Sequence, residues 1–175
     1  MKSSYGVWQL WGFAATSALG TVLHFLYDLS GSSCLVAPFS GVNESTWEHM
    51  KLLFFPTFIF AIVQSFFLGE RRDFWCIKLK GIILGLAIIP IIFYTYNGAI
   101  GKSPDWFNIS IFFIAAGISY IYEFRQFKGK ESLCKKPYLA LFALCALALL
   151  FVVFTFKTPH LGIFKDPLTG AYGIL

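Results

Sequence analysis

The sequence is poor in charged residues. Only 13% of its 175 residues are Asp, Glu, Lys or Arg, whereas 57% are hydrophobic, and the mean hydropathy is +0.69. This composition lies outside the usual range of soluble domains, and the length fits one domain, residues 1–175. The cations stand in short gaps between apolar runs, so the net charge of +5 is typical of membrane topology signals and indicates no nucleic-acid partner. We therefore predict a multi-pass membrane protein.

Two further features are missing. The four cysteines have no metal-type spacing, and no two of them fall in one predicted aqueous loop, so we predict no disulfide framework. The N-terminal apolar stretch has no small-x-small cleavage site close behind it, which favours a retained helix over a removed signal peptide.

What the sequence does contain is five apolar runs, each near the roughly 20 residues that cross about 30 Å of hydrocarbon. They cover about residues 6–28, 47–69, 75–97, 106–126 and 137–156. The predicted fold class is therefore an all-α integral membrane protein, a bundle of five transmembrane helices with its termini on opposite sides. Ten of the fourteen cations fall on the side of the N-terminus, which predicts a cytoplasmic N-terminus and an external C-terminus.

This orientation places the polar chemistry on the outer side. The residues concerned are the three histidines and five of the nine acids: His24, His49, His160, Asp28, Glu44, Glu48, Asp105 and Asp166. By contrast, the inner half shows few polar groups, since Glu123 and Arg125 resemble ordinary boundary charges and the last span has no strongly polar group. We expect the last span to be a lipid-facing wall.

Residues 43–51 (NESTWEHMK) are the most polar stretch and lie at the mouth of the second span. Ser45 and Glu48 fit a capping box, which would explain Glu48 without a functional role. It does not explain Glu44 or His49. Lys51 lies three residues beyond Glu48, and this spacing predicts an ion pair between them.

The first span carries a stripe at four-residue steps, in which small residues permit close helix packing and polar residues follow. The stripe consists of Gly12, Thr16, Gly20, His24 and Asp28. Its polar end, with Tyr27 beside it, is expected to point into the bundle. A purely structural hydrogen bond between His24 and Asp28 is the alternative.

The tail, residues 158–175, is too short to cross the membrane, yet it has apolar side chains to bury. A turn signal at residues 166–170 (DPLTG) predicts that the chain folds back. We expect the tail to pack on residues 29–43 as a lid over the site, with Asp166 reaching Lys51 or His49 and Tyr172 aimed at the bundle. A tail merely adsorbed at the interface is the alternative.

Three segments, residues 24–31 (HFLYDLSG), 43–56 (NESTWEHMKLLFFP) and 164–173 (FKDPLTGAYG), carry a resemblance. The chain resembles a family of small bacterial multi-pass membrane proteins classed as a domain of unknown function. The resemblance implies a bacterial cell membrane, and it brings no activity with it.

The predicted site is an outward-facing His/carboxylate cluster that binds a divalent metal ion, or a small polar or lipid head-group ligand at the outer leaflet. The candidate metal ligands, which are also the catalytic candidates, are His24, Asp28, Glu48 and His49; the candidate ligand-binding residues are Tyr27, Glu44, Lys51, Asp166 and Tyr172. These ligand types suit zinc, manganese or iron. Against a metal, adjacent Glu48 and His49 point about 100° apart on a helix, and no His-Glu-x-x-His pattern occurs.

Two alternatives stay open. A membrane-embedded hydrolase or isomerase would use the same site, through paired carboxylates or attack by Ser30 or Ser45, although no spacing is diagnostic. A small-solute transporter would need an oligomer with a shared pore, because five helices without an internal repeat are few for a carrier. The sequence leaves open whether the protein is an enzyme.

Overall fold

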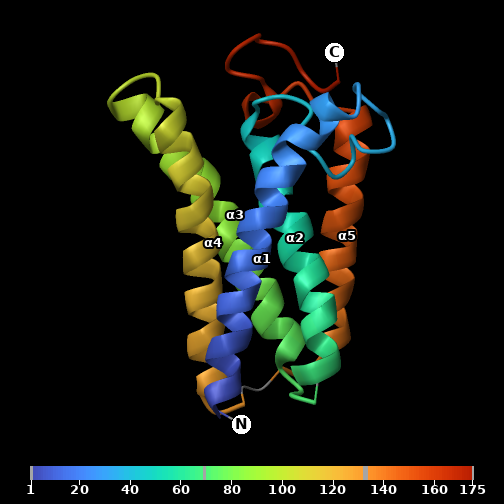
Figure 1. Cartoon of the computed structure of the whole chain (residues 1–175), viewed down its shortest axis with the longest axis vertical. Helices are drawn as coiled ribbons and strands as arrows, with labels where there is room; N and C mark the ends of the chain where they lie inside the picture. The colour runs from blue at the N-terminus through green and yellow to red at the C-terminus, as the bar shows by residue number, and fades with distance from the viewer. Residues whose placement is uncertain (1, 69, 132–133, 175) are drawn as a thin grey trace.

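The described residues form five long helices, each antiparallel to the one before it, so that the N- and C-terminal ends of the chain lie at opposite ends of the bundle (Figure 1). The computed structural model describes residues 2–68, 70–131 and 134–174. The elements are α1 (Lys2–Leu29), α2 (Thr46–Leu68), α3 (Phe74–Ala99), α4 (Asp105–Lys128) and α5 (Pro137–Phe156), followed by a single 3₁₀ turn, η1 (Gly162–Phe164). Apart from one bridge between Lys165 and Tyr172, the described residues form no β pairing.

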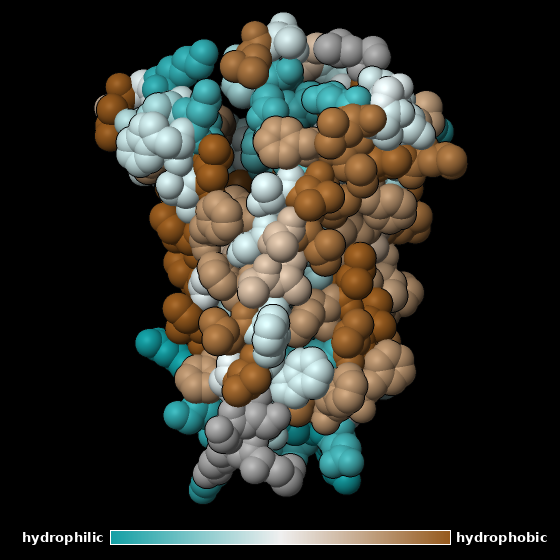
Figure 2. All heavy atoms as spheres, in the orientation of Figure 1, coloured by the Kyte–Doolittle hydropathy of each residue, from teal (hydrophilic) through white to brown (hydrophobic). Residues whose placement is uncertain are grey.

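All five helices are long and apolar enough to cross a membrane. At 1.5 Å per residue even α5, with 20 residues, reaches about 30 Å. Figure 2 shows hydrophobic side chains around the middle of the visible face and hydrophilic ones toward both ends. The five predicted helices are confirmed, with ends that differ from the prediction by a few residues.

Small residues let α1 approach its neighbours closely. A Cβ atom added at Gly12 would lie 2.5 Å from Tyr120 of α4, and one at Gly20 would lie 2.4 Å from Phe112 of the same helix. The predicted small-residue stripe therefore marks a real helix contact. α1 packs on α2 and α4, whereas α3 packs on α2, α4 and α5.

The core is aromatic and centres on α2. Phe54 is fully buried and its ring lies 5.0 Å from that of Phe151, which α5 contributes. Most residues of α5 are exposed or half-buried, but Leu144, Phe151 and Thr155 are buried. The expected wall is therefore incomplete, because one face of this helix closes the core.

The prediction of no disulfide is wrong. Cys76 and Cys134 are bonded, with their Cα atoms 6.4 Å apart. Cys76 lies in the first turn of α3, and the α4–α5 connection returns to the same end of the bundle. Counting loops alone missed this pair because a residue in the first turn of a helix belongs spatially to the loop end beside it.

The interpretation of Glu123 as a boundary charge is also wrong. Its side chain is fully buried, and the Lys78 ammonium donates a 2.6 Å hydrogen bond to Oε2 of Glu123. Both residues lie one to two turns inside the helix ends, and α3 and α4 run side by side. Two residues that each resemble a flanking charge in the sequence can therefore form a buried ion pair across the interface of their helices.

Candidate functional site

The connection between α1 and α2, residues 30–45, is tied back onto α1. The Ser40 hydroxyl donates to the carbonyl of Leu23 and accepts a 2.9 Å hydrogen bond from the Tyr27 amide. The Gly41 amide also donates to Leu23, at 3.3 Å. These bonds carry the chain across the last turns of α1, so Glu44 arrives beside His24.

α2 begins with a partial capping box. The Glu48 amide donates to the Ser45 hydroxyl at 3.4 Å, as the sequence predicts. The reciprocal bond is absent, because the Ser45 amide donates to Asn43 and the Glu48 carboxylate accepts from Val42. Glu48 is therefore drawn into the bundle, and His49, one residue on, faces Glu44.

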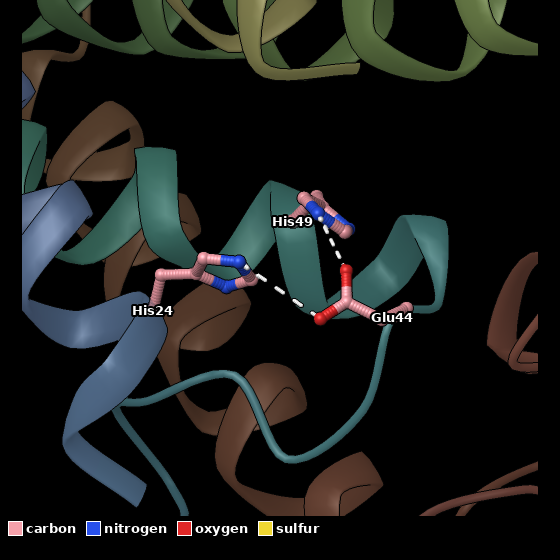
Figure 3. A group of neighbouring side chains, drawn as sticks. All are labelled: His24, Glu44 and His49. Atoms are coloured by element: carbon pink, nitrogen blue, oxygen red, sulfur yellow. Dashed lines mark ion pairs between the residues drawn. The ribbon is translucent and has the colours of Figure 1, made fainter. Parts of the chain in front are cut away.

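Three side chains meet at this junction: His24 from α1, Glu44 from the connection and His49 from α2 (Figure 3). The Nε2 atom of His49 lies 3.4 Å from one Glu44 carboxylate oxygen, and Nε2 of His24 lies 3.9 Å from the other. One ligand atom from each residue falls within 4.8 Å of the other two. All three are half-buried, so solvent and small ions reach them.

His49 is held in an orientation that suits a metal ligand. Its Nδ1 atom lies 3.0 Å from the backbone carbonyl of Ser45. A carbonyl only accepts hydrogen bonds, so Nδ1 is the donor in this contact, and Nε2 is the nitrogen directed at Glu44. Such a backbone partner fixes both the tautomer and the orientation of a ligating imidazole.

A pocket of about 70 Å³ adjoins the cluster. Glu44, Thr46 and His49 line one side, residues of α3 and α4 line another, and Pro167 and Leu168 of the tail contribute as well. In Figure 1 the ends of α3 and α4 beside this pocket lean away from the other helices. The cluster therefore has an open approach on one side.

Two of the four predicted metal ligands lie outside the cluster. Asp28 is exposed at the end of α1. Glu48 is buried and its carboxylate lies 2.5 Å from the Lys51 ammonium. The reason is the helical angle between Glu48 and His49, which lets only one of them face Glu44.

Lys51 and Glu48 form a structural pair. The fully buried Lys51 ammonium also donates to the carbonyl of Ala37 at 2.8 Å and to the Thr155 hydroxyl at 3.1 Å. With Glu48 this makes three acceptors for its three N–H groups. The predicted ion pair is present, and it ties the α1–α2 connection and α5 to α2 beneath the cluster.

The tail folds back over this end of the bundle. Its turn forms as predicted, since the Gly170 amide donates to the carbonyl of Asp166 at 2.9 Å. Phe164 is buried against Trp47, with ring centroids 4.7 Å apart. Asn43 donates to the carbonyl of Gly173 at 3.0 Å, which joins the tail to the α1–α2 connection.

The individual ligand-binding candidates in the tail have local partners. The Asp166 carboxylate accepts from Leu168 and Thr169 within its own turn, so it does not reach Lys51 or His49. Tyr172 stacks on His160 with centroids 4.7 Å apart. Tyr27 is buried in α1. None of the three is a member of the cluster.

Sequence reasoning named Glu44 as a ligand-binding residue but not as a metal ligand, and it did not identify Thr155. Glu44 carried a usable signal, since it lies one residue before the cap of α2 and four before Glu48. Thr155 carried none, because a threonine at the end of an apolar helix most often bonds its own backbone, as this one also does to Phe151.

Fold and site together define a class: an all-α protein with five helices apolar enough to cross a membrane and a His/Glu/His cluster at one end. A family model described as Family of unknown function (DUF6512) matches residues 1–174, so the chain belongs to this family. No curated protein and no solved structure matches the chain.

Proposed function

We propose that this protein is a membrane protein that binds a divalent metal ion, preferably zinc, through His24, Glu44 and His49. The observation that carries the proposal is the convergence of two imidazole Nε2 atoms on one carboxylate. Two imidazoles and a carboxylate are a common ligand set of open zinc sites.

The distances support this ligand set. Ligand atoms 2.0–2.1 Å from a tetrahedral zinc ion are about 3.4 Å from one another. The separations between Glu44 and the two imidazoles are 3.4 and 3.9 Å, each to a different carboxylate oxygen, and one ligand atom from each residue lies within 4.8 Å of the other two. Side-chain rotations that shorten the longer separations would bring all three residues into the first coordination sphere.

Three protein ligands leave a fourth position for water or a ligand, and the pocket lies beside Glu44 and His49. This arrangement favours a second candidate function, a membrane-embedded hydrolase, in which a metal-bound water would attack a substrate in the pocket. A lipid or small-molecule head group would occupy the same position in a protein that only binds. Turnover of ester and phosphoester substrates by metal-loaded protein, lost in His49→Ala, distinguishes the two.

The test of metal binding is elemental analysis of the full chain, purified in detergent without added chelator. We expect close to one metal ion per chain, and its loss in His24→Ala and in His49→Ala. His160→Ala is the matched control, because His160 lies at the same end but stacks on Tyr172 outside the cluster. Metal-free wild-type protein that also takes up no zinc on dialysis would refute the proposal.

We further propose that the protein resides in a bacterial cell membrane with the N-terminus in the cytoplasm. The support is the cation count, ten of fourteen at the N-terminal end. Cys34 is exposed in the α1–α2 connection at the opposite end. An impermeant thiol reagent added to intact cells should label it, and labelling only after lysis would reverse the orientation.

A further inference from the structure

A second group of polar side chains lies inside the bundle near its N-terminal end, far along the helices from the His cluster. Gln9 of α1, Gln64 of α2, Lys78 of α3 and Glu123 of α4 are each at most 4% exposed. We call these four residues the polar layer. Four helices that are otherwise apolar each contribute one member.

Helix contacts place the four at one level. A Cβ at Gly12 would meet both Tyr120 and Phe60, so these three positions are neighbours. One turn closer to the N-terminal end lie Gln9 on α1, Gln64 on α2 and Glu123 on α4. Lys78 joins the level through its ion pair with Glu123.

Much of the hydrogen-bonding capacity of this layer has no protein partner. Oε1 of Glu123 and both amide atoms of Gln9 and of Gln64 are buried without a hydrogen bond to any described residue. Leaving such groups unpaired in an apolar interior is unfavourable in a bilayer, where no bulk water can compensate. Three side chains with this deficit at one level indicate a shared ligand.

Protein groups bound the layer along the helix axes. Toward the N-terminal end, Phe74, Ile77 and Phe127 form a buried apolar cluster. Toward the middle of the bundle, the Tyr120 hydroxyl bonds Thr16 at 2.7 Å. Between α1 and α4, Gln9 also lines a groove of about 510 Å³, so a ligand can enter the layer from this side.

Charge narrows the ligand further. The Lys78 ammonium and the Glu123 carboxylate cancel, and the ammonium also lies 5.4 Å from the centre of the Tyr120 ring. A second cation would meet Lys78 and an anion would meet Glu123, so the ligand is neutral. The unpaired atoms comprise donors and acceptors, which a water molecule satisfies simultaneously.

We propose that the polar layer is a second binding site, specific for water, in which ordered water links the amides of Gln9 and Gln64 to the free oxygen of Glu123. The site is independent of the metal proposal, since it shares no residue with the His cluster. It places bound water and polar side chains inside the membrane-spanning part of the bundle, which the sequence alone did not indicate.

The test is a high-resolution structure of the full chain in lipid nanodiscs. We expect density at hydrogen-bond distance, roughly 2.7–3.2 Å, from Glu123 Oε1 and at least one of the two amides. Gln64→Leu should remove this density, whereas Gln126→Leu, which changes an exposed glutamine near the end of α4, should retain it. Amides bonded directly to Glu123 or to each other, with no density between, would overturn the proposal.

Thermal unfolding gives an independent readout. If the amides hold water, Gln9→Leu and Gln64→Leu should each lower the midpoint by several degrees relative to Gln126→Leu. An amide without any ligand predicts the opposite sign, because replacing an unpaired buried amide by an apolar side chain is neutral or stabilising. An unchanged or raised midpoint in both variants therefore contradicts the proposal, even if one of them cannot be crystallised or imaged.

Discussion

Two buried Lys–Glu pairs occur among the residues that the structure describes, one near each end of the bundle, and they differ in how many of their hydrogen-bonding atoms have partners. Lys51 has three acceptors, in Glu48, Ala37 and Thr155. Lys78 has one, Oε2 of Glu123, while the other oxygen of Glu123 has no partner among the described residues. The same two residue types thus form a closed structural tie at one end and an open polar layer at the other.

This difference teaches that burial of a charge does not by itself indicate a functional site. All three N–H groups of Lys51 have acceptors, so this pair serves to join three segments of the chain. The candidate metal site lies beside it, in the half-buried cluster. The Lys78 pair is incomplete, and its surplus acceptor is what points to a ligand. The number of hydrogen-bonding atoms that have partners distinguishes a structural pair from one that indicates a ligand, whereas burial does not.

The largest effect is expected for Lys51→Met. This change leaves Glu48 as an unpaired buried charge and also frees the acceptors Ala37 and Thr155. Breaking a buried pair from one side costs about 3–5 kcal/mol of the free energy of unfolding. Denaturant titration in detergent micelles measures it, and a loss below about 1 kcal/mol would show that the pair is not the tie described here.

The next effect concerns the disulfide at the N-terminal end. The bond between Cys76 and Cys134 closes a long loop, so we expect the oxidised protein to exceed Cys76→Ser/Cys134→Ser in stability by about 2–4 kcal/mol. On the proposed orientation this end faces the cytoplasm, where thiols are kept reduced. Acid-quenched cells treated with an alkylating reagent should therefore yield both cysteines as thiols, and a disulfide trapped in cells would overturn the orientation.

The comparison of the two pairs is sharpened by removing both partners at once. Lys78→Met/Glu123→Met should lie within about 1–2 kcal/mol of wild type, because replacing a whole buried pair by apolar side chains is often neutral. Glu48→Met/Lys51→Met should remain more destabilised, since Val42 and Ala37 lose their partners. Equal losses in the two double variants would mean that the pairs are equivalent after all.

The smallest effect on stability is expected at the tail. Deleting residues 164–175 should leave the five helices folded, since each is apolar enough to span a membrane independently. It removes Pro167 and Leu168 from the wall of the pocket and uncovers Trp47. A cysteine placed at position 24 should then react faster with an impermeant reagent. An unchanged rate would show that the tail does not cover the cluster.

Metal binding should also depend on pH. Metal ligation requires deprotonated imidazole nitrogen atoms, so protons compete with the metal for His24 and His49. Zinc affinity measured by competition with a chelator should therefore fall as the medium is acidified. His160→Ala should leave this profile unchanged, whereas a flat wild-type profile would exclude histidine ligands.

The sequence by itself determined the five helices, because each apolar run must satisfy its backbone internally once it lies in hydrocarbon. It also determined the pair of Glu48 and Lys51, three residues apart on one helix, and the gathering of all three histidines at one end. These features depend on local spacing and on the alternating direction of successive helices. They can be predicted without knowing which helices are in contact.

Only the tertiary structure decided the membership of the candidate sites. Glu44 lies beside His24 and His49 because Ser40 ties its loop to α1, whereas Glu48 faces Lys51 instead. Lys78 and Glu123 are 45 residues apart, and Cys76 and Cys134 are 58 apart. Such contacts depend on which helices pack side by side and at what height. The packing of all the apolar helix surfaces together determines this arrangement, and no single segment of the sequence shows it as a pattern.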